Sequence, residues 1–292
     1  MTILRFLEEG TQTMAVSPSP LRAALDHDGY VVVSNVVPKN YLDAVVHDIW
    51  RHTGASPDDR ESWYNAELIS KNGMVEMYHY PSMWNNRQFP RLHDVFTEVY
   101  GTPKLWVSLD RANLKPPADP AHPEHNQTGF IHWDTDTSVY PNIPFRVQAA
   151  LALTDTDESM GGFQCVPELF RDLATWLPKQ PPDRNPRMPD LTGYSITKVD
   201  MRAGDVVIWS TLMPHGNGHN VSTRPRLAQY ITMSPAREDD EALRQTRITC
   251  WRDRLPPPGK PFPGDPRHIE ERHGKTAELT PLGRKLLGVD RW

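Results

Sequence analysis

The sequence predicts a mainly β protein with flanking helices (α+β), in which short strands form a core of jelly-roll type. After Gly101, seven short β-favouring segments follow one another, separated by Gly, Pro, Asp or Asn. Helices do not alternate regularly with these segments, which disfavours a parallel α/β sheet. The chain has 292 residues, 38% of them hydrophobic, which is enough to build a substantial core.

We therefore expect one domain over residues 1–292 with three consecutive parts. Residues 1–103 are expected to be mainly helical and to pack on the barrel. Residues 104–236 are expected to form the jelly-roll core with the functional site. Residues 237–292 are expected to supply a C-terminal helix and a proline-rich tail.

The first elements are predicted from capping residues and from apolar residues at helical spacing. A helix should begin at Ser19, with Pro20 in its first turn, and end near Gly29. A short buried strand over 30–33 should follow.

Two more helices show the spacing of an amphipathic face. Asn40 is predicted to cap a helix whose apolar residues lie within 42–50. The same pattern recurs over 92–100 and should end at Gly101.

The later elements follow from the same signals. The expected strands are 104–115, 129–135, 145–153, 161–166, 194–201, 204–211 and 226–234. Helices are expected around 169–177 and over 238–253, and a last short one should begin at Thr280 and end at Gly288. Two proline-rich stretches, 178–189 and 255–266, should be surface loops.

Composition excludes several classes of protein. The formal net charge is -5 and the basic residues form no stripe, which argues against nucleic acid or an anionic membrane as a partner. Two cysteines, Cys165 and Cys250, do not make a disulfide scaffold. Charge interrupts residues 1–10 too early for a signal peptide, and no apolar run approaches the ~20 residues that span a bilayer. We therefore expect a soluble, cytoplasmic protein.

The first chemical signal is the pair His132 and Asp134 in a predicted strand. Side chains at i and i+2 of a strand lie on one face, so the two can hold the same ion. With a second histidine they would complete the facial triad typical of non-haem Fe(II) oxygenases. Alone, His-x-Asp arises often by chance.

The second signal is the segment from His215 to Asn220, which includes Asn217 and His219 and follows an apolar strand. A histidine where a buried strand opens into a glycine-rich turn can project into a cavity. The alternative is an ordinary loop with two solvated histidines.

The third signal is Arg226, at the start of the strand that follows. A guanidinium matches a carboxylate in a bidentate pair, and inside a barrel it requires an anionic partner. The alternative is a surface position at a turn, which is the preferred interpretation for Arg224.

Together these residues resemble the phytanoyl-CoA dioxygenase family of Fe(II)/2-oxoglutarate-dependent oxygenases. The family pattern runs His-x-Asp, then His-Gly-x-Gly-x-Asn, then an arginine. Arg226 lies 11 positions after His215 (226 − 215), the family spacing, and this register selects His215 over His219. Further similar segments are 28–33, 113–117, 162–167 and 279–288, so the resemblance spans residues ~19 to 292. One departure is Glu168-Leu169-Phe170, where relatives continue Gly-Ser-His.

The resemblance implies a double-stranded β-helix (cupin-like) core, Fe(II) as the metal, and 2-oxoglutarate and O₂ as cosubstrates. The implied metal ligands are His132, Asp134 and His215. Arg226 would hold the far carboxylate of 2-oxoglutarate, and the helping residues would be Asn217 and, more weakly, Lys115 and Gln148.

The implied reaction oxidises, and most simply hydroxylates, a C–H bond of a small organic substrate, with release of succinate and CO₂. Related halogenases have Ala or Gly where this chain has Asp134, which favours hydroxylation, desaturation or ring chemistry over halogenation.

Three residues are weaker candidates for contact with the substrate: Tyr140, Trp133 and Arg111. Trp133 should point opposite to its neighbours on a regular strand, which favours core packing, and long cations such as Arg111 often reach solvent. Two other functions stay open, a catalytically silent ligand-binding barrel and a cupin-like metal enzyme without 2-oxoglutarate, such as an isomerase. Arg226 at its spacing argues against both.

Overall fold

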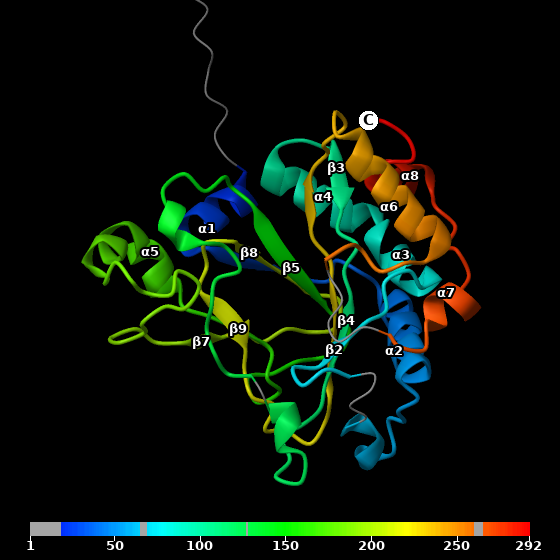
Figure 1. The fold of residues 1–292 in the computed structure, drawn as a ribbon, viewed down its shortest axis with the longest axis horizontal. Helices are drawn as coiled ribbons and strands as arrows, with labels where there is room; N and C mark the ends of the chain where they lie inside the picture. The colour runs from blue at the N-terminus through cyan, green and yellow to red at the C-terminus, as the bar shows by residue number, and fades with distance from the viewer. Residues whose placement is uncertain (1–18, 65–68, 127, 260–264) are drawn as a thin grey trace, which may run out of the picture.

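The structure is a computed structural model that describes residues 19–64, 69–126, 128–259 and 265–292 (Figure 1). The expectation for residues 1–10 lies outside these ranges, and the predicted loop 255–266 lies partly outside them. Within the described ranges, every helix is too short or too polar to cross a bilayer.

A six-stranded sheet forms the centre of the molecule (Figure 1). Its strands, in spatial order, are β1 (Tyr30–Val33), β8 (Val206–Ser210), β5 (Val147–Ala152), β10 (Arg226–Tyr230), β4 (Ala112–Lys115) and β2 (Met74–Val75). Every neighbouring pair in it is antiparallel.

Two smaller antiparallel sheets accompany the large one. The three-stranded sheet has the order β7 (Thr197–Lys198), β6 (Phe163–Cys165) and β9 (His215–Asn217). The two-stranded sheet pairs β3 (Leu105–Val107) with β11 (Met233–Pro235). The protein is therefore mainly antiparallel β with helices, as the sequence predicted.

Most helices lie on one side of the large sheet, and α5 lies beyond its other side (Figure 1). The helices are α1 (Pro20–Asp28), α2 (Lys39–Thr53), α3 (Pro81–Arg87), α4 (Pro90–Tyr100), α5 (Pro167–Trp176), α6 (Glu241–Asp253), α7 (Ile269–His273) and α8 (Pro281–Leu287). Short 3₁₀ turns occur at Arg60–Tyr64, Pro123–Asn126, Thr137–Val139 and Leu177–Lys179.

Capping residues set the ends of the helices that the sequence predicted best. The Ser19 hydroxyl accepts the backbone N–H of Arg22 in the first turn of α1, and Gly29 ends this helix at a φ of 77°. Thr280 caps α8 in the same way, and Gly288 ends it at a φ of 99°. These predicted boundaries are confirmed.

Three local predictions are corrected. Helix α2 begins one residue before Asn40, after Pro38, and no side chain caps it. The short helices α3 and α7 were not predicted, because each contains too few residues to show an apolar face. Residues 129–135 do not form a regular strand; among them only His132 makes an isolated bridge.

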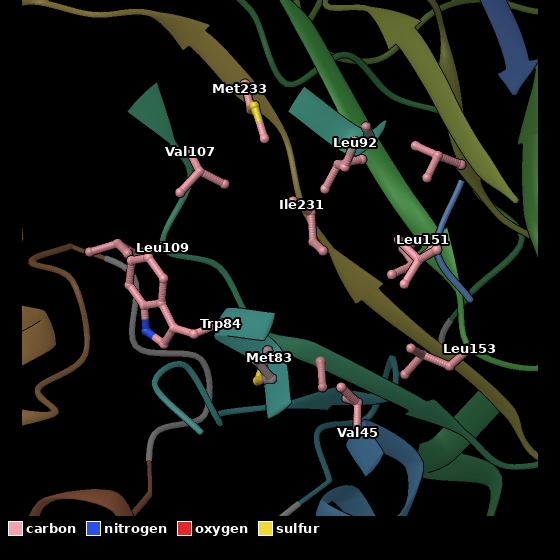
Figure 2. Close-up of a cluster of buried hydrophobic side chains, with 14 of the residues drawn as sticks. Val45, Met83, Trp84, Leu92, Val107, Leu109, Leu151, Leu153, Ile231 and Met233 are labelled. Atoms are coloured by element: carbon pink, nitrogen blue, oxygen red, sulfur yellow. The ribbon is translucent and has the colours of Figure 1, made fainter. Parts of the chain in front are cut away.

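The large sheet is buried on both faces. On β5, Leu151 faces the helices and Ala150 faces the three-stranded sheet, as the alternation along a strand requires. The helix side forms the larger core, to which Leu151 of β5, Val45 of α2 and Trp84 of α3 belong (Figure 2). Each such buried side chain contributes about 1.5–3 kcal/mol. The other face of the sheet carries a smaller apolar cluster and the polar groups described next.

Candidate functional site

Backbone pairing brings the two predicted histidine ligands together. The N–H of His132 donates to the carbonyl of His215 at 2.9 Å, and the N–H of His215 donates back at 3.0 Å. Residues that exchange both bonds in an antiparallel pair carry their side chains on the same face. The two imidazole rings accordingly lie 4.8 Å apart, centroid to centroid.

Gly216 permits this close approach. A Cβ atom added at this position would lie closer to the carbonyl oxygen of Phe130 than Cβ atoms in proteins lie to other heavy atoms. The glycine after the second histidine is therefore needed for β9 to lie against the segment that carries His132.

Asp134 completes the cluster. Its Oδ1 lies 3.2 Å from Nε2 of His132, and its Oδ2 lies 3.6 Å from Nε2 of His215. One ligand atom from each of the three residues lies within 4.8 Å of the others. Nδ1 of His215 lies 2.9 Å from the carbonyl of Met213; assigning the ring proton to this nitrogen leaves Nε2 free to bind a metal.

These donors fit a non-haem iron. Two imidazole nitrogens and one carboxylate oxygen on one side of an ion are the facial set of Fe(II) oxygenases, and they leave positions open for other ligands. Two ligand atoms that lie about 2.1 Å from one ion, with a right angle at the ion, are about 3 Å apart. This is close to the distance between Nε2 of His132 and Oδ1 of Asp134. Cys165 and Cys250 contribute nothing to this cluster.

The Asp134 carboxylate is held in its charged form. Its contact with His132, then that with His215, and a bond from Gln148 hold the pKa of this carboxyl well below its usual range, against the opposing effect of burial. Nε2 of Gln148 donates to Oδ2 of Asp134 at 2.5 Å. Gln148, predicted to help bind a cosubstrate, thus contacts a ligand of the proposed metal.

A cavity of about 540 Å³ opens beside the three ligands. Arg226 lines it and is 3% exposed. Its Nη1 donates to Oδ1 of Asn113 and to Oδ1 of Asn217, each at 3.3 Å. Among the residues that the structure describes, no carboxylate forms an ion pair with it. A buried guanidinium without an acidic partner is unfavourable, so the cavity is suited to an anionic ligand.

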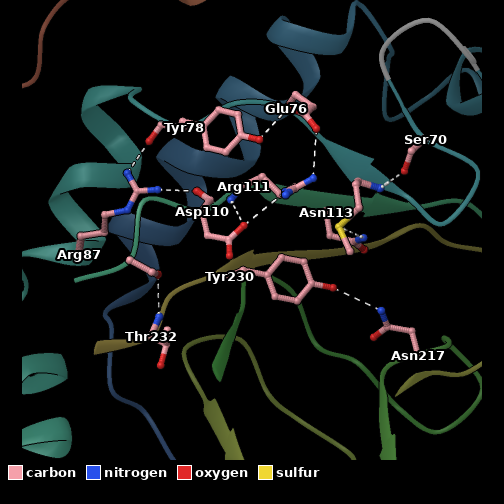
Figure 3. Close-up of polar contacts among 12 residues, drawn as sticks. Ser70, Glu76, Tyr78, Arg87, Asp110, Arg111, Asn113, Asn217, Tyr230 and Thr232 are labelled. Atoms are coloured by element: carbon pink, nitrogen blue, oxygen red, sulfur yellow. Dashed lines mark hydrogen bonds and ion pairs between the residues drawn. The ribbon is translucent and has the colours of Figure 1, made fainter. Parts of the chain in front are cut away.

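The Asn217 amide joins Arg226 to a second polar group. Its oxygen accepts from Arg226, and its Nδ2 donates to the Tyr230 hydroxyl at 3.3 Å (Figure 3). Arg226 and Tyr230 are four positions apart on β10 and so project to the same face. Arg226, Asn217 and Tyr230 form the polar end of the cavity.

Arg111 lies on the cavity wall beside Tyr230. Its guanidinium forms an ion pair with Glu76 at 3.1 Å and with Asp110 at 3.3 Å (Figure 3). Glu76 also accepts from the Tyr78 hydroxyl at 2.7 Å. Arg111 is 9% exposed and does not reach into bulk solvent, so it stays a candidate for substrate contact.

Lys115 lies apart from the cavity. It is opposite Arg226 in the register of β4 and β10, but its ammonium donates to the carbonyls of His125 and Lys71. Burial lowers the pKa of this amine to about 8. The described contacts of Lys115 are thus with backbone, and it does not line the cavity.

Trp133 and Tyr140 also lie outside the cavity, which corrects their assignment as candidate lining residues. The Trp133 indole points to the opposite side from the ligands, donates to the carbonyl of Leu212 at 2.8 Å, and packs against Trp176. Tyr140 packs against the same hydrophobic cluster, which contains Trp133 and the buried side chains of α5. This direction of Trp133 agrees with the prediction that its side chain points opposite to those of its two neighbours, His132 and Asp134.

Several residues of the site were not predicted from the sequence: Thr128, Phe130, Trp209 and Tyr230, which line the cavity, and Asn113, which accepts from Arg226. The position of Tyr230, four residues after Arg226 on one strand, was a usable signal. The others depend on which strands become neighbours, and no local pattern marks that. His219, in contrast, contacts Asn126 at 2.8 Å and is not part of the metal cluster.

Comparisons with known proteins identify the family and the fold. The family model described as Phytanoyl-CoA dioxygenase (PhyH) matches residues 25–228. A Dictyostelium discoideum protein, provisionally named a phytanoyl-CoA dioxygenase, is 24% identical over 257 residues, covering 71% of this chain and 72% of that protein.

Two solved structures share the fold. The epimerase SnoN, in complex with Fe³⁺, alpha ketoglutarate and nogalamycin RO, aligns with a TM-score of 0.51 at 20% identity over 74% of this chain and 82% of its own. HygX from Streptomyces hygroscopicus, with nickel and 2-oxoglutarate bound, aligns with a TM-score of 0.50 at 14% identity over 74% and 86%. The family match covers all three ligand positions and Arg226. The chain therefore belongs to the phytanoyl-CoA dioxygenase family.

Proposed function

We propose that this protein is an Fe(II)/2-oxoglutarate-dependent oxygenase that hydroxylates a C–H bond of a small organic substrate. The observation that carries the proposal is Arg226, a buried guanidinium without an acidic partner in the described chain, in the same cavity as two imidazoles and a carboxylate. A dicarboxylate can bind the metal ion through one of its ends and the Arg226 guanidinium through the other.

The residues of the chain have separate tasks in this proposal. His132, Asp134 and His215 would hold the ion, which when bound supplies the activation of O₂ that oxidation of a C–H bond requires. Asn217 keeps the Arg226 guanidinium aimed into the cavity, since it accepts one of its N–H groups.

The cavity walls favour a small molecule as substrate. The volume of about 540 Å³ lies within the usual range of small-molecule sites. Phe130, half of whose surface is exposed, lines the cavity beside His132, and Asp110 and Arg111 lie on its wall. A substrate with both apolar and polar parts would fit between them. We propose no nucleic acid or membrane partner, and a cytoplasmic location.

We also propose that the large and the three-stranded sheets together form a double-stranded β-helix within one domain. Support comes from a hydrophobic cluster between them, to which Ala150 and Val207 contribute from the large sheet and Phe163 and Cys165 from the small one.

The test is turnover of 2-oxoglutarate by the purified full chain. With Fe(II), O₂ and 2-oxoglutarate, slow release of succinate is expected without substrate, and faster release with the correct member of a panel of amino acids, lipids, acyl thioesters and natural-product scaffolds. A product heavier by one oxygen atom identifies hydroxylation. An isomer of unchanged mass would instead assign an epimerase reaction such as that of SnoN. Absence of 2-oxoglutarate binding by the metal-loaded chain would refute the proposal.

A further inference from the structure

Within the described residues, one side chain from outside the ligand set bonds to the Asp134 carboxylate. Nε2 of Gln148, on β5, donates to Oδ2 of Asp134 at 2.5 Å. Gln148 is opposite Trp209 of β8 in the sheet register, and the Trp209 indole N–H donates to Oε1 of Gln148 at 3.1 Å. A chain of two hydrogen bonds thus runs from Trp209 through Gln148 to Asp134.

The two end groups determine the orientation of the Gln148 amide. An indole nitrogen can only donate, and an ionised carboxylate can only accept. The amide oxygen must therefore face Trp209, and the amide nitrogen must face Asp134. In the reversed orientation both contacts would be repulsive.

One carboxylate oxygen of Asp134, Oδ2, is consequently engaged by the Gln148 amide, while Oδ1 contacts only the ligand His132 among the described residues. We propose that Gln148 is a positioning residue that keeps Asp134 a ligand through one oxygen, and that Trp209 holds the Gln148 amide in the orientation this requires. The inference rests on the proposed Fe(II)/2-oxoglutarate function.

The consequence concerns the positions around the ion. An octahedral ion with three protein ligands has three positions left, two for a chelating 2-oxoglutarate and one for O₂. If both oxygens of Asp134 bound, one of these positions would be lost. Gln148 would then affect cosubstrate binding more than metal binding.

The experiment measures two dissociation constants by calorimetry on the full chain. Ni(II), which does not turn over, is titrated first, and 2-oxoglutarate is then titrated into the Ni(II)-loaded protein. Gln148→Met keeps the length of the side chain and removes the donor. We expect its 2-oxoglutarate Kd to rise by about 10-fold or more, and its Ni(II) Kd to change by less than about 3-fold.

Trp209→Phe tests the second bond of the chain. It should weaken 2-oxoglutarate binding by about 3-fold or more, because the amide is no longer held. In the Gln148→Met background the same change should add less than about 2-fold, since its effect passes through Gln148. If Gln148→Met does not fold, Trp209→Phe alone decides: weaker 2-oxoglutarate binding at unchanged Ni(II) binding supports the proposal, and unchanged binding of both overturns it.

Gln229→Met is the matched control. Gln229 is a fully buried glutamine of the same sheet, on β10, that bonds to Asn86 and to the carbonyl of Met83 on the helix side. Its loss should lower the Tm without altering either dissociation constant. If wild type binds both ligands and Gln148→Met binds 2-oxoglutarate normally, or loses both affinities equally, this inference is wrong. If wild type binds neither ligand, the proposed function fails instead.

Discussion

Asp134 is the residue on which the contacts of the proposed centre converge. It lies within 3.6 Å of a nitrogen of each histidine ligand and accepts from Gln148. Its side chain is nonetheless 47% exposed, so the ion it would hold is reachable from the cavity. Arg226, in contrast, is buried, and its proposed role in binding a carboxylate depends on the charge and the planar shape of its guanidinium.

Asp134→Ala should reduce turnover of 2-oxoglutarate to background. The variant loses the one anionic ligand, and an imidazole pair alone binds Fe(II) weakly. Succinate release and Ni(II) calorimetry on the same preparation check this. Turnover near the wild-type rate would contradict the ligand role.

Arg226→Met should raise the KM for 2-oxoglutarate at least about 30-fold, which corresponds to a loss of about 2 kcal/mol from an unpaired carboxylate. Metal binding should be unchanged, because Arg226 contacts none of the three ligands. Arg224→Met is a suitable control, since Arg224 is exposed and two positions away. Equal effects of both substitutions would show that Arg226 does not recognise the carboxylate.

Among the elements, the helices differ in how they begin. Helix α1 has a side-chain cap at Ser19, whereas α2 follows Pro38 without one. Helix α7 is anchored differently, because Glu270 accepts the backbone N–H groups of Tyr78 and His79 at 2.6 Å each. These two residues lie on the chain just after Glu76, which pairs with Arg111 of the cavity wall.

Ser19→Ala should lower the free energy of unfolding by about 1 kcal/mol, the usual effect of a lost N-cap. Asn40→Ala should have no destabilising effect, because Asn40 lies inside α2 and does not cap it. Urea unfolding curves of the two variants test this contrast. A comparable loss in both would show that Asn40 does act as a cap.

Glu270 should make stability depend on pH. Burial raises the pKa of its carboxyl to about 7, from 4.5. The folded state therefore holds this proton more tightly than the unfolded state does. The resulting stabilisation is fully present below about pH 4.5 and is lost as pH rises through about 7.

Between pH 5 and pH 8, wild type should therefore lose stability relative to Glu270→Gln, which cannot titrate, by roughly 2–3 kcal/mol. Unfolding free energies at several pH values measure the difference. Parallel pH profiles for the two proteins would exclude this role of Glu270.

At the scale of the whole molecule, the proposed ion connects segments that are distant in sequence. His215 belongs to β9, and His132 and Asp134 belong to a segment without regular structure that pairs with β9 through the isolated bridge of His132 and His215. A ligand bound only by the folded state stabilises it by about 2.7 kcal/mol at 100 times its Kd.

Ni(II) at that excess should therefore raise the Tm by roughly 5–10 °C, since ~1 kcal/mol corresponds to ~2–4 °C in chains of similar size. A chelator should reverse the shift, and Asp134→Ala should not show it. Thermal unfolding followed by circular dichroism provides the measurement. An equal shift in Asp134→Ala would indicate metal binding elsewhere.

Features that depend on neighbouring residues could be predicted from the sequence alone. The caps at Ser19 and Thr280 and the turn at Gly288 follow from local hydrogen bonds and backbone angles. The sequence also predicts the chemical type of the site, because two imidazoles, a carboxylate and a guanidinium at this spacing resemble the family pattern.

Which side chains meet in the site depends on the packing of segments that are distant in the sequence. The pairing of His132 with His215 and the bond from Gln148 to Asp134 depend on contacts between segments far apart in sequence. The predicted strand at 129–135 became an irregular segment for the same reason, since a β ladder needs a partner along its whole length. Local propensity encodes the elements and the ligand types, and packing of the sheets selects their neighbours.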